Sequence, residues 1–176
     1  MKSWLAPDLV LLAPITGITP QLMEKHGLQG LILDVDNTLI GDNESDVSEV
    51  IRLWAELMSK PYSICLASNN FSDRRIKKIA ESLNLPYRSR AAKPSRRVVR
   101  QVLEEMKLPP SQVAMVGDRL FTDTIVGNRL GLFTILVQPP INELALNPST
   151  FSIFKSRSNF LRSWEIWIAR KSGVKI

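Results

Sequence analysis

Short apolar runs alternate along this chain with segments of helical periodicity, and this alternation constrains the fold more than any other feature. The predicted strands cover residues 31–36, 62–67, 113–117 and 132–137, with a short one at 86–88, and the predicted helices cover 46–59, 72–83, 95–107 and 122–130. Strands that alternate with helices form a parallel sheet covered by helices. The sequence therefore predicts an α/β fold with a central parallel sheet and helices on both of its faces.

Two aspartates stand at the end of the first apolar run. Asp34 and Asp36 follow Leu31–Leu33, so both carboxylates are predicted at the sheet edge where α/β folds bind ligands. Two carboxylates so close repel each other, and a divalent cation such as Mg²⁺, which prefers hard oxygen ligands, would neutralise them. The alternative is an ordinary Asp-rich turn in which Asn37 and Thr38 cap the local backbone. The two aspartates alone leave both interpretations open.

Three further polar clusters fall at strand ends or helix starts. They are Ser68-Asn69-Asn70 after the run 62–67, Ala92-Lys93-Pro94 before a predicted helix, and Asp118 with Asp123 after the run 113–117. In a parallel sheet these positions converge on one edge. Carboxylates there could hold a metal and supply a nucleophile, a hydroxyl with neighbouring amides could bind phosphoryl oxygens, and a lysine could balance negative charge. Together these residue types indicate metal-assisted phosphoryl transfer.

The four motifs, in this order, resemble those of the haloacid dehalogenase (HAD) superfamily of aspartate-nucleophile phosphatases. The resemblance covers about residues 28–138, and it implies a Rossmann-like HAD fold. The residue sequences of three motifs are most similar to the YqeG-type, class IIIA branch, which is itself similar to mitochondrial and plastid phosphatidylglycerophosphate phosphatases. Those motifs are Asp34-Val35-Asp36-Asn37-Thr38-Leu39, Ser68-Asn69-Asn70 and Gly117-Asp118-Arg119-Leu120-Phe121-Thr122-Asp123.

The resemblance implies a role for each aspartate of the first motif. Asp34 would attack phosphorus and form an aspartyl-phosphate. Asp36 would protonate the leaving oxygen and then activate the water that hydrolyses the intermediate. Mg²⁺ would be held by the Asp34 carboxylate, the Asp36 backbone carbonyl and Asp118. The sequence pattern supports carboxylates at the end of this strand, but it does not show which aspartate attacks phosphorus.

The resemblance also assigns the phosphoryl end of the site. Ser68, together with the Asn69 amide, would bind phosphoryl oxygens, and Lys93 would neutralise the phosphoryl group and the nucleophile. Asp123 would orient the waters of the metal, or Lys93, from behind the metal ligands. The alternative for Asp123 is a carboxylate at the start of a helix, which the helix dipole favours.

The gaps between the motifs are short. The chain between Thr38 and the second predicted strand, and between Ser68 and Lys93, has room for little more than one helix in each gap. In this superfamily such gaps would hold cap domains, so we expect a capless enzyme with an open active site. An open site suits a phosphate carried on a lipid surface or a macromolecule, although a partner subunit could serve as the lid.

The scarce residue types exclude several other classes. Cys65 is the only cysteine, and the position six residues after it is Phe71, which excludes a Cys-x5-Arg phosphatase; we expect Cys65 to be a small buried side chain. The only histidine, His26, is predicted at the end of a short helix that starts near Thr19-Pro20, so a His-nucleophile phosphatase is not supported. No Gly-rich nucleotide-binding motif occurs. The single cysteine excludes a disulfide framework, so we expect a cytoplasmic protein.

Length and charge suggest two regions. Residues 1–150 are expected to form a single HAD phosphatase core with an N-terminal extension, and 151–176 a basic amphipathic C-terminal helix. The net charge is +6, and two segments, 88–100 and 151–176, hold six basic residues each, against a single acidic residue, Glu165. The C-terminal segment could lie at an anionic membrane surface, or pack its aromatic stripe on the domain or in a dimer. The 88–100 segment could attract anionic substrates or be a solvated helix face.

Three functions compete at this point. We expect Mg²⁺-dependent dephosphorylation of a lipid-linked substrate, and the first candidate for this substrate is phosphatidylglycerophosphate. We also expect the protein to contact an anionic membrane peripherally. The second candidate is a soluble HAD phosphatase for a sugar phosphate, nucleotide or phosphoprotein. The third is a non-catalytic HAD-fold binding module, which the four intact motifs disfavour. No recognised motif supports nucleic-acid binding, and the oligomeric state is not predicted.

Overall fold

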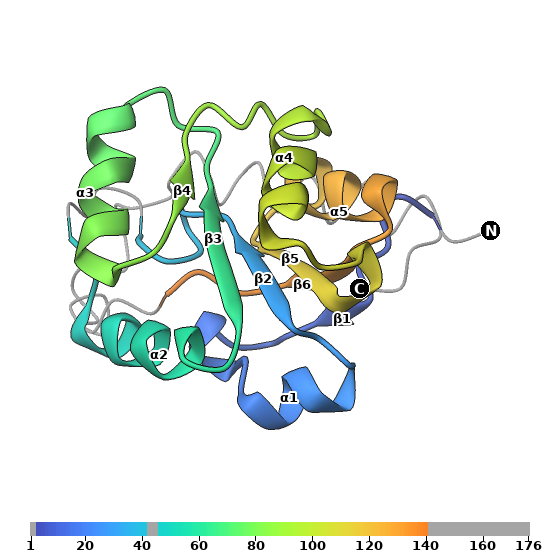
Figure 1. Cartoon of the computed structure of the whole chain (residues 1–176), viewed down its shortest axis with the longest axis horizontal. Helices are drawn as coiled ribbons and strands as arrows, with labels where there is room; N and C mark the ends of the chain where they lie inside the picture. Colours follow the sequence, from blue (N-terminus) through green and yellow to red (C-terminus); the bar gives the residue numbers. More distant parts are fainter. Residues whose placement is uncertain (1–2, 42–45, 141–176) are drawn as a thin grey trace, which may run out of the picture.

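A computed structural model describes residues 3–41 and 46–140, and these residues form a six-stranded sheet with helices on both faces (Figure 1). The strands are β1 (Leu9–Val10), β2 (Gly30–Leu33), β3 (Ser63–Ala67), β4 (Tyr87–Arg88), β5 (Val113–Gly117) and β6 (Phe133–Leu136). Their order in the sheet is β1-β6-β5-β2-β3-β4, and every neighbouring pair is parallel. The predicted α/β fold is confirmed, and each predicted strand is present within three residues of its predicted bounds.

The helices cover the sheet in two layers. They are α1 (Pro20–Lys25), α2 (Glu49–Ser59), α3 (Asp73–Leu83), α4 (Arg97–Met106) and α5 (Ile125–Leu130). Alternate residues of a strand face opposite sides of its sheet. Leu31 and Leu33 of β2 pack in one core with α1, α2 and α3, whereas Ile32 packs in a second core with α4 and α5. Almost continuous burial of β2 and β5 is what a parallel sheet covered on both faces requires.

Several helix boundaries differ from the prediction. The helix predicted at 46–59 begins at Glu49, because the hydroxyl of Ser48 caps it by accepting the N–H of Ile51 at 3.4 Å. The helix predicted at 122–130 is in two parts, a π-helical turn at Leu120–Thr124 and then α5. The short helix near Thr19-Pro20 is present as α1, with the Thr19 hydroxyl accepting the N–H of Leu22. Two short 3₁₀ turns, Ile15–Gly17 and Pro110–Gln112, complete the described elements.

The edge strand β1 was not predicted from the sequence. It pairs with β6, with Leu9 opposite Ile135. Side chains fasten the segment around it: the Asp8 carboxylate accepts the N–H and the hydroxyl of Thr134, both at 2.9 Å. The Asn128 amide donates to two carbonyls of the N-terminal segment, at 2.8 and 2.9 Å. These contacts tie the start of the chain to the sheet edge.

The connections between the site-bearing strands are short. Within residues 46–140, α2 alone leads into β3, and α3 with β4 leads from β3 to the loop before α4, so no cap domain is inserted there. The structure contains no described helix with the length and apolarity needed to cross a bilayer. The predicted C-terminal helix, 151–176, and the predicted limit of the core at residue 150 lie outside the described residues.

Candidate active site

Three neighbouring strands in the middle of the sheet end at the site. β2 lies between β3 and β5, and the three run parallel, so their carboxyl ends open at one edge. The ladder continues one residue past β2, where the Asp34 N–H donates to the Val116 carbonyl at 2.9 Å. Asp34 therefore lies beside the end of β5, next to Asp118. On the other side of β2, Ser68 directly follows β3 and is fully buried.

A buried lysine joins two of these strand ends. The Lys93 side chain is 1% exposed, and its Nζ lies 2.6 Å from Asp34 Oδ1 and 2.8 Å from Asp123 Oδ1. The side chain of Asn69 holds the backbone of Lys93 in place: its Nδ2 donates to the Lys93 carbonyl at 2.9 Å, and its Oδ1 accepts the Lys93 N–H at 2.7 Å. These two hydrogen bonds fix the loop between β4 and α4 in the position from which the Lys93 side chain contacts Asp34, directly after β2.

Three buried carboxylates gather at these strand ends. Asp34, Asp118 and Asp123 each offer an oxygen atom, and these oxygens lie within 4.8 Å of one another. Opposite ligands of Mg²⁺ stand about 4.2 Å apart, since each lies about 2.1 Å from the ion. Small side-chain movements would therefore let all three carboxylates bind one divalent cation. Fully ionised, three carboxylates and one lysine leave two negative charges, which a divalent cation balances.

Burial sets the ionisation of the site. It raises the pKa of Asp34 to about 7, against the opposing pull of Lys93, and the nearby Asp123 carboxylate adds to the rise. Burial alone would lower the pKa of Lys93, but Asp123 and Asp34 together raise it above its ordinary value, so the lysine stays protonated. A bound cation would favour the ionised form of Asp34.

Gly117 makes room for one of these carboxylates. A Cβ atom at this position would lie 2.2 Å from Asp123 Oδ2, far inside van der Waals contact. The same Oδ2 accepts the N–H of Arg119 at 3.3 Å. Only glycine at the end of β5 allows Asp123 to lie against the strand and reach Lys93.

The second aspartate of the first motif faces a different group of residues. The Asp36 carboxylate pairs with Arg75 of α3, with Arg75 Nη1 2.5 Å from Oδ1. Its Oδ2 accepts the Ser68 hydroxyl at 3.4 Å and the Asn70 amide at 3.3 Å. The Ser68 oxygen in turn accepts the Asn70 N–H at 3.0 Å. Asp36 is partly exposed, unlike Asp34, which suits a group that exchanges protons with substrate and water.

The structure thus divides the predicted site residues into two groups. Asp34, Lys93, Asp118 and Asp123 form the buried cluster, and the second group pairs the partly exposed Asp36 with the buried Ser68. The side chain of Asn69 is occupied by the Lys93 backbone, so its predicted contact with phosphate would need its own backbone N–H or a rearrangement. The roles of these residues, including the predicted contribution of the Asp36 carbonyl to the metal, remain predictions.

Two participants were not foreseen from the sequence. Arg75 and Asn70 both contact Asp36, one from the first turn of α3 and the other from the loop before it. Asn70 stands next to predicted site residues in the motif Ser68-Asn69-Asn70, and this proximity was the available signal. Nothing in the helical pattern distinguishes Arg75 from the neighbouring basic residues.

Comparison with known proteins agrees with this geometry. A family model described as HAD-hydrolase-like matches residues 90–143, which include Lys93, Asp118 and Asp123. The chain is 32% identical over 140 residues to the probable phosphatase YqeG of Bacillus subtilis (strain 168), covering 79% of this chain and 80% of that protein. The chain belongs to this family of HAD phosphatases.

More distant relatives of this HAD phosphatase differ in how much of the chain they match. Phosphatidylglycerophosphate phosphatase 1, chloroplastic/mitochondrial, of Arabidopsis thaliana is 27% identical over 129 residues, which cover 68% of this chain and 37% of that protein. The structure of a putative 3-deoxy-D-manno-octulosonate 8-phosphate phosphatase from Vibrio cholerae superposes with a TM-score of 0.54 at 15% identity, covering 90% of this chain and 94% of that chain. This second likeness shows the shared fold.

Proposed function

We propose that this HAD phosphatase hydrolyses phosphatidylglycerophosphate to phosphatidylglycerol in a Mg²⁺-dependent reaction that passes through an aspartyl-phosphate on Asp34. The observation that carries the chemistry is the buried Lys93, held 2.6 Å from Asp34 and 2.8 Å from Asp123 at the edge where the strands end. A protonated lysine in contact with a carboxylate at this edge positions the nucleophile and offsets the charge of an incoming phosphate.

The chain's own groups account for both chemical steps. In the first, an Asp34 oxygen attacks phosphorus, the bond from phosphorus to the leaving oxygen breaks, and Asp36 gives that oxygen a proton. In the second, Asp36 takes a proton from water, which attacks phosphorus and releases inorganic phosphate and the Asp34 carboxylate. Ser68 stands beside Asp36, where its hydroxyl and the following backbone can bind the phosphoryl oxygens.

The metal site is proposed from the same cluster. Asp34, Asp118 and Asp123 carry hard oxygen ligands at spacings close to those of Mg²⁺, and the Asp36 carbonyl is a further candidate. A bound Mg²⁺ would neutralise phosphoryl oxygens and the negative charge of the carboxylates. Lys93 would then keep Asp34 oriented and Asp123 turned towards the site.

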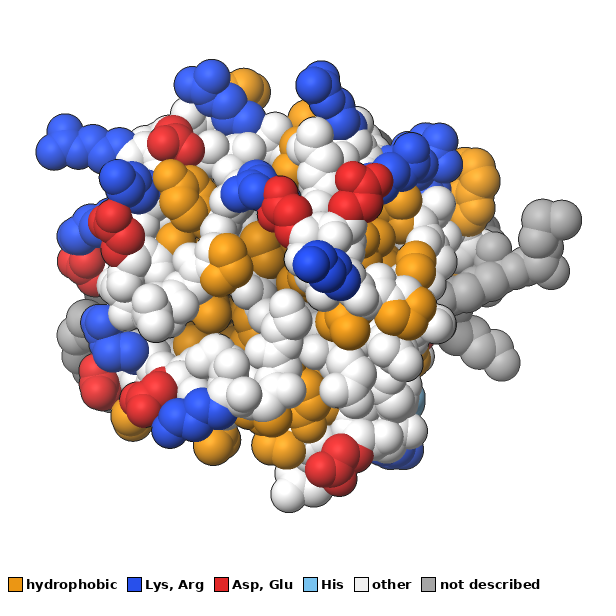
Figure 2. Space-filling model, in the orientation of Figure 1, with side chains coloured by type: hydrophobic (Ala, Val, Ile, Leu, Met, Phe, Trp, Pro, Cys, Tyr) orange, Lys and Arg blue, Asp and Glu red, His pale blue; other side chains and the backbone are white. Residues whose placement is uncertain are grey.

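The substrate assignment rests on three supports. A relative whose alignment covers 68% of this chain carries the name phosphatidylglycerophosphate phosphatase. The described residues 46–140 hold no cap domain, which leaves room for a phosphate presented at a lipid surface. Lys and Arg side chains stand along the upper edge of the molecule, over the loops that precede α3 and α4 (Figure 2). This charge would draw an anionic substrate or membrane to the site.

The test is phosphate release from phosphatidylglycerophosphate in liposomes, with and without Mg²⁺, beside p-nitrophenyl phosphate and the Asp34→Asn variant. The proposal expects Mg²⁺-dependent release from the lipid that the variant lacks. Release from the small ester alone would keep the phosphatase and replace the lipid substrate by a soluble one, such as a sugar phosphate, nucleotide or phosphoprotein. Sedimentation with anionic liposomes, repeated after removal of residues 157–176, would show whether that segment brings the enzyme to a membrane.

A further inference from the structure

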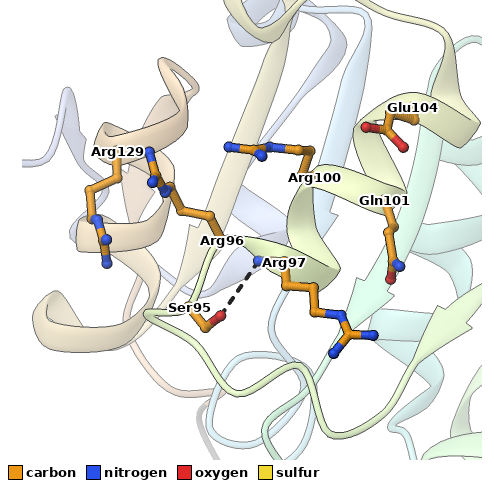
Figure 3. A pocket seen from close by; sticks show the side chains of 7 residues that line it. All are labelled: Ser95, Arg96, Arg97, Arg100, Gln101, Glu104 and Arg129. Carbon is orange, nitrogen blue, oxygen red and sulfur yellow. Dashed lines mark hydrogen bonds between the residues drawn. The ribbon is translucent and has the colours of Figure 1, made fainter.

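A basic pocket lies between α4 and α5, beside the loop that carries Lys93. It has a volume of about 540 Å³ and is lined by Ser95, Arg96, Arg97, Arg100, Gln101, Glu104 and Arg129. Figure 3 shows Arg96 and Arg100 of the α4 segment extending toward α5, Arg129 lying along α5, and Arg97 pointing the other way. Three arginines from the two sides thus line one hollow.

The pocket accounts for only part of the basic segment at 88–100. Arg88 is paired with Glu105 on the exposed side of α4, and Arg90 donates to the Phe71 carbonyl at 3.4 Å. Lys93 is buried in the catalytic cluster. The segment is therefore not one continuous solvated face, because three of its six basic side chains have partners elsewhere and two others, Arg96 and Arg100, extend into this pocket.

The arginines of the α4 segment have no carboxylate partner among residues 3–41 and 46–140. No ion pair joins Arg96, Arg97 or Arg100 to Glu104, the acidic residue that lines the pocket. Guanidinium groups that converge without an intervening anion repel one another, and each presents N–H groups in the planar arrangement that matches phosphate oxygens. An anion with several oxygens would relieve the repulsion and satisfy these donors.

The pocket and the catalytic lysine are mechanically joined. Arg129 Nη1 donates to the Pro94 carbonyl at 3.0 Å, next to Lys93, and its guanidinium lies 6.0 Å from the centre of the Trp4 ring. Three peptide units separate Lys93 from Arg96, so their Cα atoms lie within about 11 Å of each other. The pocket therefore begins on the loop that carries Lys93.

We propose that the pocket formed by Arg96, Arg100 and Arg129 binds a second phosphate group of the substrate, so that the enzyme selects a phosphomonoester that also carries a phosphodiester. The inference rests on the proposed phosphatase and narrows its substrate class. It places substrate selection on α4 and α5, away from the residues that perform the chemistry.

The test compares two soluble monoesters that differ by the second phosphate. Glycerol 3-phosphate carries the monoester alone, and glycerophosphoglycerophosphate, the deacylated lipid headgroup, carries both groups. For Arg96→Gln/Arg100→Gln, we expect kcat/KM to fall about 10- to 100-fold for the headgroup, the size of losing charge-assisted hydrogen bonds. For glycerol 3-phosphate we expect a change below about 3-fold, since only the charge near the site differs.

The matched control removes the same charge from the other face of the sheet. Lys60→Gln/Lys77→Gln alters two exposed lysines, one directly after α2 and one in α3, each paired with a glutamate four residues away. Equal losses for both esters in the pocket variant, or an equal loss for the headgroup in the control, would overturn the subsite. So would a wild-type enzyme that hydrolyses both esters with the same kcat/KM.

Two further arms separate other outcomes. A loss seen only on phosphatidylglycerol vesicles, and not with the soluble headgroup, would mean that the arginines meet a charged surface, which contradicts the subsite. Calorimetric binding of the headgroup is measured in parallel, so that an enzyme inactive on both esters, which would refute the proposed function, still tests the pocket. Weaker binding to the pocket variant supports the subsite, and equal binding refutes it.

Discussion

Replacing Lys93 by methionine should destabilise the metal-free protein strongly, because it leaves two carboxylates buried without their counter-ion. Lys93 Nζ contacts Asp34 at 2.6 Å and Asp123 at 2.8 Å, and its side chain is 1% exposed. Breaking a buried ion pair by removing one partner costs about 3–5 kcal/mol. For a domain of this size each kcal/mol lowers Tm by about 2–4 °C, so we expect Tm to fall by about 6–20 °C in EDTA.

Differential scanning calorimetry in EDTA measures this change, with Lys77→Met as the matched control. Lys77 is exposed and lies 3.7 Å from Glu81, so its replacement should cost at most about 0.5 kcal/mol. Adding Asp123→Asn to Lys93→Met should recover part of the loss, since one buried carboxylate is then neutral. A Tm for Lys93→Met within about 2 °C of the wild type would refute the buried-pair account.

Three other predictions test single features of the site. Gly117→Ala should displace Asp123, because its Cβ would lie 2.2 Å from Oδ2; turnover should fall at least about 10-fold while far-UV circular dichroism stays native, and full activity would contradict this. Asn69→Ala removes two hydrogen bonds to the Lys93 backbone and should lower the free energy of unfolding by about 1–3 kcal/mol in denaturant titrations. A raised KM with an unchanged free energy of unfolding would support the phosphate-binding role of Asn69 instead. Burial raises the pKa of Cys65 to about 11, so at pH 8 its alkylation should be at least about 100-fold slower in the folded protein than in the unfolded chain. The rate in the folded protein should rise about tenfold per pH unit towards pH 10. Equal alkylation rates in the folded and unfolded protein would contradict the burial of this thiol.

The central strands and their polar ends could be predicted because each carries a local signal. β2, β3 and β5 are apolar runs of the right length, and the parallel arrangement follows from the helices between them. Asp34, Ser68 and Asp118 then had to share one edge of the sheet. The predicted site residues are positioned by backbone topology, and the hydrophobic periodicity of the sequence indicates that topology.

What could not be predicted depends on contacts between distant side chains. β1 is only two residues long, and it is held by a bond network from Asp8 to Thr134, more than a hundred residues away in sequence. The chain between Asn69 and Lys93, whose backbone the Asn69 amide holds, contains the helix α3 and the strand β4. The division of the 88–100 charge depends on how α4 is rotated, which brings Arg88 to Glu105 and leaves Arg100 in the pocket.

The central claim is that Asp34 is the nucleophile, and a rapid acid quench with a ³²P-labelled phosphomonoester tests it most directly. The label should appear on the protein within one turnover, in the peptide that contains Asp34, and hydroxylamine should release it as an acyl phosphate. Asp34→Asn should carry no label while binding the substrate. Label on another residue, or hydrolysis by Asp34→Asn at the wild-type rate, would contradict the account.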